Sequence, residues 1–354
     1  VDFVNDTQAY ENALQAFQEY HPINNEFYGD TGDPRTAEER RLYRYRTFGN
    51  DAALFILDTR SFRDAQIDPY NPDDPADITR FLSAAFDPTR TLLGQAQLEM
   101  LKADLLEAKN AGIRWKFIAV PEPIQNFGPA TAEDRFEGYA AERTELLKFI
   151  DDNNIENVVF FAADFHGTIV NNLTYQLAPD GEQIATGAFE IVTGPVAFFD
   201  GRFGPNVVAI ATTFGLIDAE QQAVYDALPV APDPDDQVND KDDFVKQLLI
   251  QQTQAFGYDP VGLEGSEIDA ELLQGDYVAA HNFGWTEVEI DATTGNLTVT
   301  VYGIEAYSEA ELVAKPNDIT GRTPTVLVEF QVTPQDVPAP TPTGRVLYLP
   351  IVAR

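Results

Sequence analysis

Three short apolar segments, alternating with two amphipathic ones, constrain the fold of this 354-residue chain more than any other feature. The predicted strands span 53–57, 115–120 and 157–163, and the last reads Asn-Val-Val-Phe-Phe-Ala-Ala. Between them, 95–109 and 139–152 place Leu and Ile at helical spacing. A strand that is almost wholly apolar is typical of a sheet covered on both faces. The pattern therefore predicts an α/β fold built from βαβ units.

Polar residues follow each of the three predicted strands. Asp58 and Arg60 follow the first strand, Glu122 the second, and Asp164 and His166 the third. In sheets of this type, ligands bind beyond the carboxyl ends of the strands, where the loops diverge. The sequence therefore predicts a functional site at that edge of the sheet.

The segment Asp164-Phe165-His166 is the strongest local candidate for chemistry. Alternate side chains at a strand end can turn toward one point, so the pair offers a carboxylate and an imidazole together. This arrangement suits metal ligation or acid–base catalysis. Arg60 is the candidate for a phosphate contact, because a guanidinium binds phosphate oxygens through two parallel hydrogen bonds. An ion pair with one of the many acidic residues is the simpler alternative for Arg60 and for Arg63.

Composition and missing motifs exclude several classes of function. With 58 Asp and Glu against 23 Lys and Arg, the formal net charge is -35, so nucleic acids and anionic membrane surfaces are not expected partners. No segment reaches the roughly 18 apolar residues of a membrane span. The chain has no Gly-x-Ser-x-Gly elbow and no phosphate-binding glycine loop, which disfavours a serine hydrolase and a nucleotide cofactor.

The absence of cysteine and the presence of only three histidines restrict any metal site. Cysteine thiolates and a histidine-rich zinc cage are excluded, so oxygen ligands would have to dominate. High acidity without cysteine also favours an extracellular or periplasmic, secreted protein.

The remaining segments predict a less regular second half. Residues 10–17 have helical spacing and are expected to pack in the core, and the Asp-rich segment 229–243 is expected to be a solvent-exposed loop rather than a calcium site. Residues 285–291 and 297–302 predict a β-hairpin, with further strands at 188–193 and 326–332.

The chain is expected to form one domain over 1–332, followed by a Pro/Thr-rich linker at 333–344 and a short apolar tail at 345–354. Such a tail can add as a strand to an exposed sheet edge, which makes self-association through it an open possibility.

Several segments together resemble the C-terminal portion of the alkaline phosphatase D (PhoD-like) metallophosphatases. They are Leu57-Asp58-Thr59-Arg60-Ser61-Phe62-Arg63-Asp64, Leu93-Gly94 with Gln97 and Leu101, Trp115-Lys116, Glu137-Gly138-Tyr139 with Glu142-Arg143 and Leu146-Leu147, Asp164-Phe165-His166, and His281-Asn282-Phe283-Gly284-Trp285. The resemblance implies a metallophosphatase-like four-layer αββα sandwich, incomplete at the N-terminus in this chain. It also implies a secreted phosphomonoesterase or phosphodiesterase that acts on phosphate esters with iron and calcium.

The resemblance also implies roles for individual residues. Asp164 and His166 match the family's Gly-Asp-x-His segment at the metal site, with Ala163 in place of the glycine. Asp134 matches an acidic residue that precedes the family's Trp-Asp-Gly-Tyr, which here reads Phe-Glu-Gly-Tyr. The expected metal ligands are therefore Asp164, His166 and Asp134, and the expected catalytic residues are His166 and Arg60.

The chain lacks the family's upstream Gly-Asp-x-x-Tyr and Asp-Asp-His-Glu segments. We therefore expect this chain to supply only part of a two-metal site. Either it is a fragment, or an upstream piece associates with it, or catalysis has been lost. The alternatives to an enzyme are a non-catalytic extracellular structural or assembly module that keeps the phosphatase scaffold, and a calcium-binding structural domain.

Overall fold

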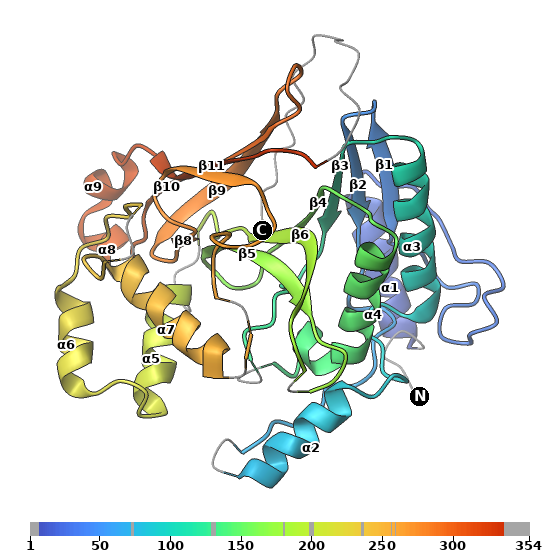
Figure 1. Cartoon of the computed structure of the whole chain (residues 1–354), viewed down its shortest axis with the longest axis horizontal. Coiled ribbons are helices and arrows are strands. Elements are labelled where there is room, and N and C mark those ends of the chain that lie inside the picture. The colour runs from blue at the N-terminus through green and yellow to red at the C-terminus, as the bar shows by residue number, and fades with distance from the viewer. Residues whose placement is uncertain are drawn as a thin grey trace.

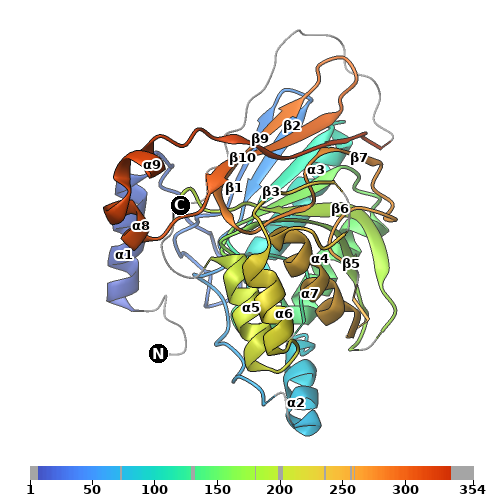
Figure 2. The ribbon, with the colours of Figure 1, turned by 90° about the vertical axis from the view of Figure 1, so that its left-hand side faces the viewer.

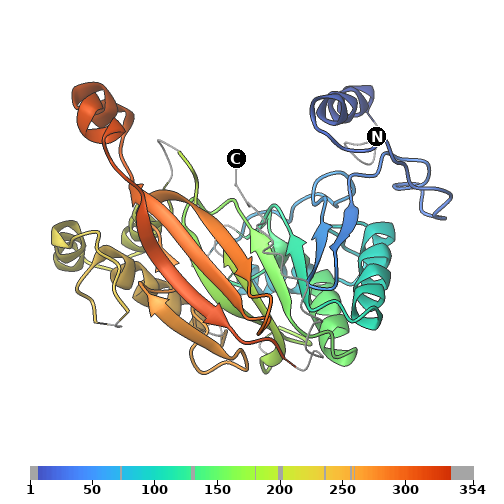
Figure 3. The ribbon, with the colours of Figure 1, turned by 90° about the horizontal axis from the view of Figure 1, so that it is seen from above.

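Two β-sheets packed face to face form the centre of the structure, with helices on the outer face of the larger sheet (Figures 1 and 3). The computed structural model describes residues 7–71, 74–128, 132–179, 181–197, 202–234, 237–255, 257–258 and 260–335. Among these residues, no helix is long and apolar enough to cross a membrane.

The larger sheet has seven strands and contains the predicted βαβ units. In spatial order the strands are β1 (Arg44–Phe48), β2 (Ala52–Ile56), β3 (Trp115–Ala119), β4 (Val158–Ala162), β6 (Ile184–Val192), β5 (Thr168–Tyr175) and β8 (Val278–Ala279). The four strands β2, β3, β4 and β6 are parallel, whereas β1 and β5 run antiparallel to their neighbours. The α/β prediction is confirmed, although the pattern indicated only the parallel part of what is a mixed sheet.

Helices cover the outer face of this sheet. The predicted helices are α3 (Gln95–Asn110), between β2 and β3, and α4 (Ala140–Asp152), which follows a 3₁₀ turn at Phe136–Tyr139. Their inward residues are buried against strands β2, β3 and β4: Leu98, Leu101, Leu105, Leu146, Leu147 and Ile150. Helices α5 (Phe203–Thr213) and α7 (Lys241–Ala255) extend the same layer, with α6 (Ala219–Ala227) packed beside α5.

The smaller sheet is antiparallel throughout and covers the inner face of the larger one. Its strands lie in the order β7 (Ala270–Gln274), β11 (Thr325–Val332), β10 (Leu297–Glu305) and β9 (Asn282–Ile290). The predicted hairpin is β9–β10, and inward side chains such as Val299 and Phe330 pack with Phe117 and Phe161 of the larger sheet. These aromatic and branched side chains form the second half of the core.

The described residues form three layers: helices, large sheet and small sheet. The second helical layer implied by the family resemblance is not seen among them. Helices α8 (Glu309–Ala314) and α9 (Pro316–Thr320) project from the end of the small sheet instead of lying across it (Figure 3). Alternate residues on its outer face, including Trp285, Glu289 and Tyr302, are exposed or half-buried.

The sequence analysis is wrong or incomplete in three details. Helix α1 (Gln8–Tyr20) follows its Thr7 cap, but Phe17 is exposed rather than packed in the core, and only Leu14 and Gln18 of the helix are buried. Helix α2 (Pro75–Ala85), which the sequence analysis did not predict, projects from one end of the molecule (Figures 1 and 2). An apolar stripe is a local pattern, so it does not reveal whether any surface is present to cover it.

The third error concerns the Asp-rich segment 229–243, of which residues 235 and 236 lie outside the described residues. Asp240, Asp242 and Asp243 are buried rather than exposed. Asp240 caps the start of α7 by accepting the backbone N–H groups of Asp242 and Asp243, at 2.7 and 3.0 Å. Asp242 in turn lies 2.6 Å from Nδ1 of His281. Local backbone bonds and one imidazole therefore compensate for part of the burial, while Oδ2 of Asp240 and Oδ2 of Asp242 have no hydrogen-bond partner among the described residues.

The predicted linker at 333–344 and the tail at 345–354 lie outside the described residues, apart from 333–335. Gln335 is anchored to Asn157 at the start of β4 through bonds of 2.7 and 3.0 Å.

Candidate active site

The loops that follow β2 and β3 bring Arg60, Glu122 and Asp134 together. Nη2 of Arg60 lies 2.6 Å from Oε1 of Glu122, and Nη1 donates to Oδ1 of Asp134 at 2.8 Å. Arg63 makes a second ion pair with Asp134. The guanidinium of Arg60, on the loop after β2, is therefore held between two carboxylates of the segment that follows β3, while its side chain remains 45% exposed.

Glu122 is the buried member of this group, with only 1% of the residue exposed. Its Oε2 accepts a hydrogen bond from the Thr59 hydroxyl. Burial raises the pKa of Glu122 to about 7. The hydrogen bond from Thr59 and the positive charge of Arg60 oppose this rise, and the negative charges of Asp134 and Asp164 add to it. The sequence marked Glu122 as a strand-end residue but did not single it out as a site residue.

Asp134 is the exposed member, and it acts as a counter-ion for two arginines. Burial alone would raise its pKa, but hydrogen bonds from Arg60, Gln66 and Arg63 hold the pKa of Asp134 below its ordinary value. The ionised carboxylate is thus stabilised by guanidinium groups. The assignment of Asp134 as a metal ligand stays a prediction.

Asp164 and His166 lie on the loop between β4 and β5, in a strained backbone conformation. Their φ angles are +74° and +59°, a region that non-glycine residues seldom adopt. Strain of this kind persists where surrounding contacts enforce it, and it is frequent at functional sites. Here the carbonyl of His166 accepts the Phe203 N–H at 3.3 Å, and Phe165 stacks on the Phe203 ring. The start of α5 therefore fixes the loop.

Asp164 lies close enough to Arg60 and Glu122 for its charge to act on both. Burial alone would lower the pKa of Arg60, but the hydrogen bond to Asp134 and nearby carboxylates, Asp164 among them, raise it overall. Asp164 is exposed and His166 is half-buried, so both are accessible from solvent. The structure thus gathers Arg60, Asp134 and Asp164, three of the four predicted site residues, and places His166 two residues further along the Asp164 loop.

Buried polar side chains fix the backbone of the site loops. The sequence analysis did not assign this role to them. The Gln97 amide bonds to both backbone groups of Asp58, at 2.8 and 2.7 Å, and so fixes the loop that carries Arg60. Glu190 accepts the N–H groups of Ile124 and Gln125, at 2.7 and 3.1 Å, and so fixes the loop that carries Glu122. The sequence could have indicated them, because a polar residue within an apolar strand or helix face becomes buried and then needs a hydrogen-bond partner.

The residues at this edge fit a metal site in kind but not in number. Carboxylate and imidazole donors suit iron and calcium or other cations of that type. Within the described ranges, however, no group of three or more His, Asp or Glu residues is arranged to hold a metal.

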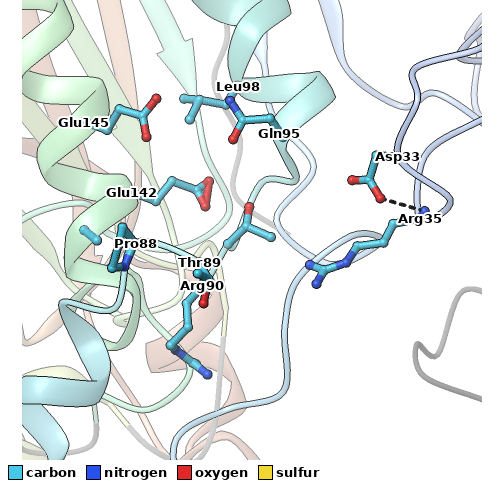
Figure 4. A pocket seen from close by; sticks show the side chains of 11 residues that line it. Asp33, Arg35, Pro88, Thr89, Arg90, Gln95, Leu98, Glu142 and Glu145 are labelled. Atoms are coloured by element: carbon cyan, nitrogen blue, oxygen red, sulfur yellow. Dashed lines mark hydrogen bonds between the residues drawn. The ribbon is translucent and has the colours of Figure 1, made fainter.

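A separate cavity of about 240 Å³ lies where the loop before α3 meets α4 (Figure 4). Glu142 lines it and accepts the N–H groups of Leu92 and Leu93, at 2.6 and 2.9 Å. The cavity contains none of the predicted site residues. The buried carboxylate of Glu142 has a structural role, because it accepts hydrogen bonds from backbone N–H groups of this loop.

The chain belongs to the PhoD-like phosphatase family, whose model matches residues 4–251. A curated relative, alkaline phosphatase D of Bacillus subtilis (strain 168), is 32% identical over 167 residues. The match covers 46% of this chain but only 26% of that protein, so the chain spans about a quarter of its relative's length. A solved structure titled "Structure of PhoD" has 27% sequence identity, covering 51% of this chain and 33% of that chain. Its TM-score of 0.38 is too low to support an argument about shape.

Proposed function

We propose that this chain forms part of a metal-dependent phosphatase that hydrolyses phosphate mono- or diesters. The observation that carries the proposal is the convergence of Arg60, Asp134 and Asp164 at the carboxyl ends of parallel strands, in a member of the PhoD-like family. Arg60 has N–H groups left to donate to a phosphate oxygen, and its exposure leaves room for a ligand.

Asp164 and His166 are the residues that would hold the metal, with iron and calcium as the proposed ions. A bound cation would polarise the phosphoryl group and offset its developing charge. The strained loop that carries both residues keeps their side chains at the site edge before any ligand arrives, since the start of α5 fixes it. Arg60 orients the phosphate, and His166 is also the candidate for moving a proton.

If this chain supplies only part of a two-metal site, as expected from the sequence, activity requires a partner. We propose that the remaining ligands come from an upstream segment of the same protein or from another copy of this chain. An extracellular or periplasmic location and self-association through the tail at 345–354 belong to the same proposal.

The test combines elemental analysis with hydrolysis of p-nitrophenyl phosphate and bis-p-nitrophenyl phosphate. We expect His166→Ala to lower hydrolysis by about 100-fold or more, because acid–base and electrostatic contributions at a metal site are of this size. Its metal content should fall while its melting temperature changes little. His21→Ala is the matched control, because His21 is the exposed C-cap residue of α1, and its ring stacks on Phe17 and lies 2.6 Å from the Phe17 carbonyl.

Full hydrolysis by His166→Ala would overturn the assignment of His166. Stoichiometric metal without any hydrolysis of either ester, even with the upstream segment added, would favour the calcium-binding structural domain. Absence of both metal and hydrolysis under those conditions would favour the non-catalytic assembly module.

A further inference from the structure

Glu122 is a buried carboxylate whose two oxygens each meet a side chain of the neighbouring loop. Its Oε2 accepts from the Thr59 hydroxyl, and its Oε1 meets Nη2 of Arg60 at 2.6 Å. Burying a carboxylate costs several kcal/mol unless its partners compensate, so a neutral side chain of similar shape would often be as stable or more stable here. A carboxyl group kept in such a place needs an explanation other than stability.

The position of Glu122 is fixed more firmly than that of the other carboxylate on Arg60. Pro121 and Pro123 flank it and restrict the backbone. The next two N–H groups of its loop are bound by Glu190, a residue that is fully buried in β6. Asp134, by contrast, has a side chain that is 42% exposed. An incoming anion can therefore reach the pair of Arg60 and Asp134 from solvent, whereas Glu122 is shielded from it.

We propose that Glu122 is a positioning residue that aims the Arg60 guanidinium at the phosphate group. Thr59 supports this role by donating to the second oxygen of the carboxylate, and Glu190 supports it by fixing the backbone that follows Glu122. This inference rests on the proposed function for its ligand, but the contact between Glu122 and Arg60 can be tested without catalysis.

The experiment measures the reactivity of single arginines in the full chain. Phenylglyoxal modifies guanidinium groups, and peptide mass spectrometry follows each site separately. We expect Glu122→Gln to accelerate labelling of Arg60 several-fold and to leave Arg46, an exposed residue of β1, unchanged. The amide keeps the shape of the side chain, so the melting temperature should not fall. Thr59→Val removes the hydroxyl donor and should accelerate the labelling of Arg60 to a smaller extent. It replaces Glu122→Gln in the test if that variant does not fold.

Asp104→Asn is the matched control. Asp104 lies on α3, and its half-buried carboxylate accepts a hydrogen bond from the Tyr43 hydroxyl at 2.7 Å. Its substitution should leave the labelling of Arg60 unchanged. Inorganic phosphate should slow labelling of Arg60 in the wild-type chain, and a several-fold higher concentration should be needed in Glu122→Gln.

Unchanged labelling of Arg60 in folded Glu122→Gln would overturn the proposal, as would a wild-type Arg60 that phosphate does not protect. Faster labelling together with weaker phosphate protection would support it. If these shifts appear but the complete protein hydrolyses neither ester, then the proposed phosphatase function fails while the positioning of Arg60 by Glu122 stands.

Discussion

Buried carboxylates in this protein bind backbone N–H groups, and Glu142 shows the principle at the scale of one residue. It is almost completely buried and accepts two backbone hydrogen bonds from the loop that leads into α3. Glu190 does the same for the loop after β3. Buried N–H groups need acceptors, and a carboxylate can serve two of them at once.

We predict that Glu142→Ala destabilises the fold by about 2–4 kcal/mol, because two buried N–H groups lose their acceptor. Glu145→Ala is the matched control, one turn further along α4 on the rim of the same cavity (Figure 4). Glu145 is half-exposed and pairs with Lys102, so its loss should cost about 1 kcal/mol or less. Urea denaturation measures both values, and equal losses would contradict the role given to Glu142.

At the scale of elements, the start of α3 links the helix layer to the site. Gly94 precedes the helix with a φ of +78°, and a Cβ at that position would lie 2.7 Å from Cβ of Phe62. One turn into α3, Gln97 holds the backbone of Asp58. The geometry of this helix start therefore determines where the Arg60 loop lies.

Gly94→Ala should be more destabilising than Gly112→Ala. Both glycines have positive φ, which costs an alanine roughly 1–2 kcal/mol. Only Gly94 adds a collision, and overpacking costs about 1–3 kcal/mol more. We expect about 1 kcal/mol for Gly112→Ala and about 3 kcal/mol for Gly94→Ala, measured by chemical denaturation. Equal values would show that Phe62 moves aside without cost.

At the scale of the whole molecule, acidic groups make stability depend on pH. Burial raises the pKa of both Glu142 and Glu190 from an ordinary value of 4.5 to about 7. The folded state therefore binds these protons more tightly than the unfolded chain does. The cost of ionising the two buried groups is absent below about pH 4.5, grows as the pH rises, and is complete above pH 7.

We predict that the free energy of unfolding increases by about 2 kcal/mol or more when the pH is lowered from 8 to 5, since each unit of pKa shift corresponds to about 1.4 kcal/mol. Thermal melting across this range measures the effect. Repulsion within a chain of net charge -35 acts in the same direction, but about 1 M salt screens it. The trend should therefore persist at high salt, and its disappearance there would assign it to surface charge instead.

Removal of residues 336–354 should leave the fold intact, because Gln335 anchors the end of the described chain to Asn157. We expect an unchanged melting temperature. If the tail mediates self-association, sedimentation velocity should show the loss of a larger species. Identical sedimentation of both chains would remove the tail from the proposed assembly.

The sequence predicted site residues mainly where they directly follow a predicted strand. Asp164 and His166 were found because they follow an apolar strand, and Arg60 was found for the same reason. Glu122 was noticed without a role, since its meaning depends on contacts with Thr59 and Arg60 from another loop. Phe17 shows the opposite failure, because a helical stripe predicted burial where the structure leaves it exposed.

The sequence by itself determined the α/β class, the helices and strands of the βαβ units, the β9–β10 hairpin and the family. These follow from periodicity and from short motifs, which are local properties of the chain. The tertiary structure decided the mixed strand order, the packing of the small sheet and the ion-pair network of the site. Such features depend on contacts between distant residues, as when Trp115 Nε1 donates to the Gly295 carbonyl at 2.9 Å. Only folding brings such groups into range, and their burial then determines which charges are tolerated and which backbone groups they bind.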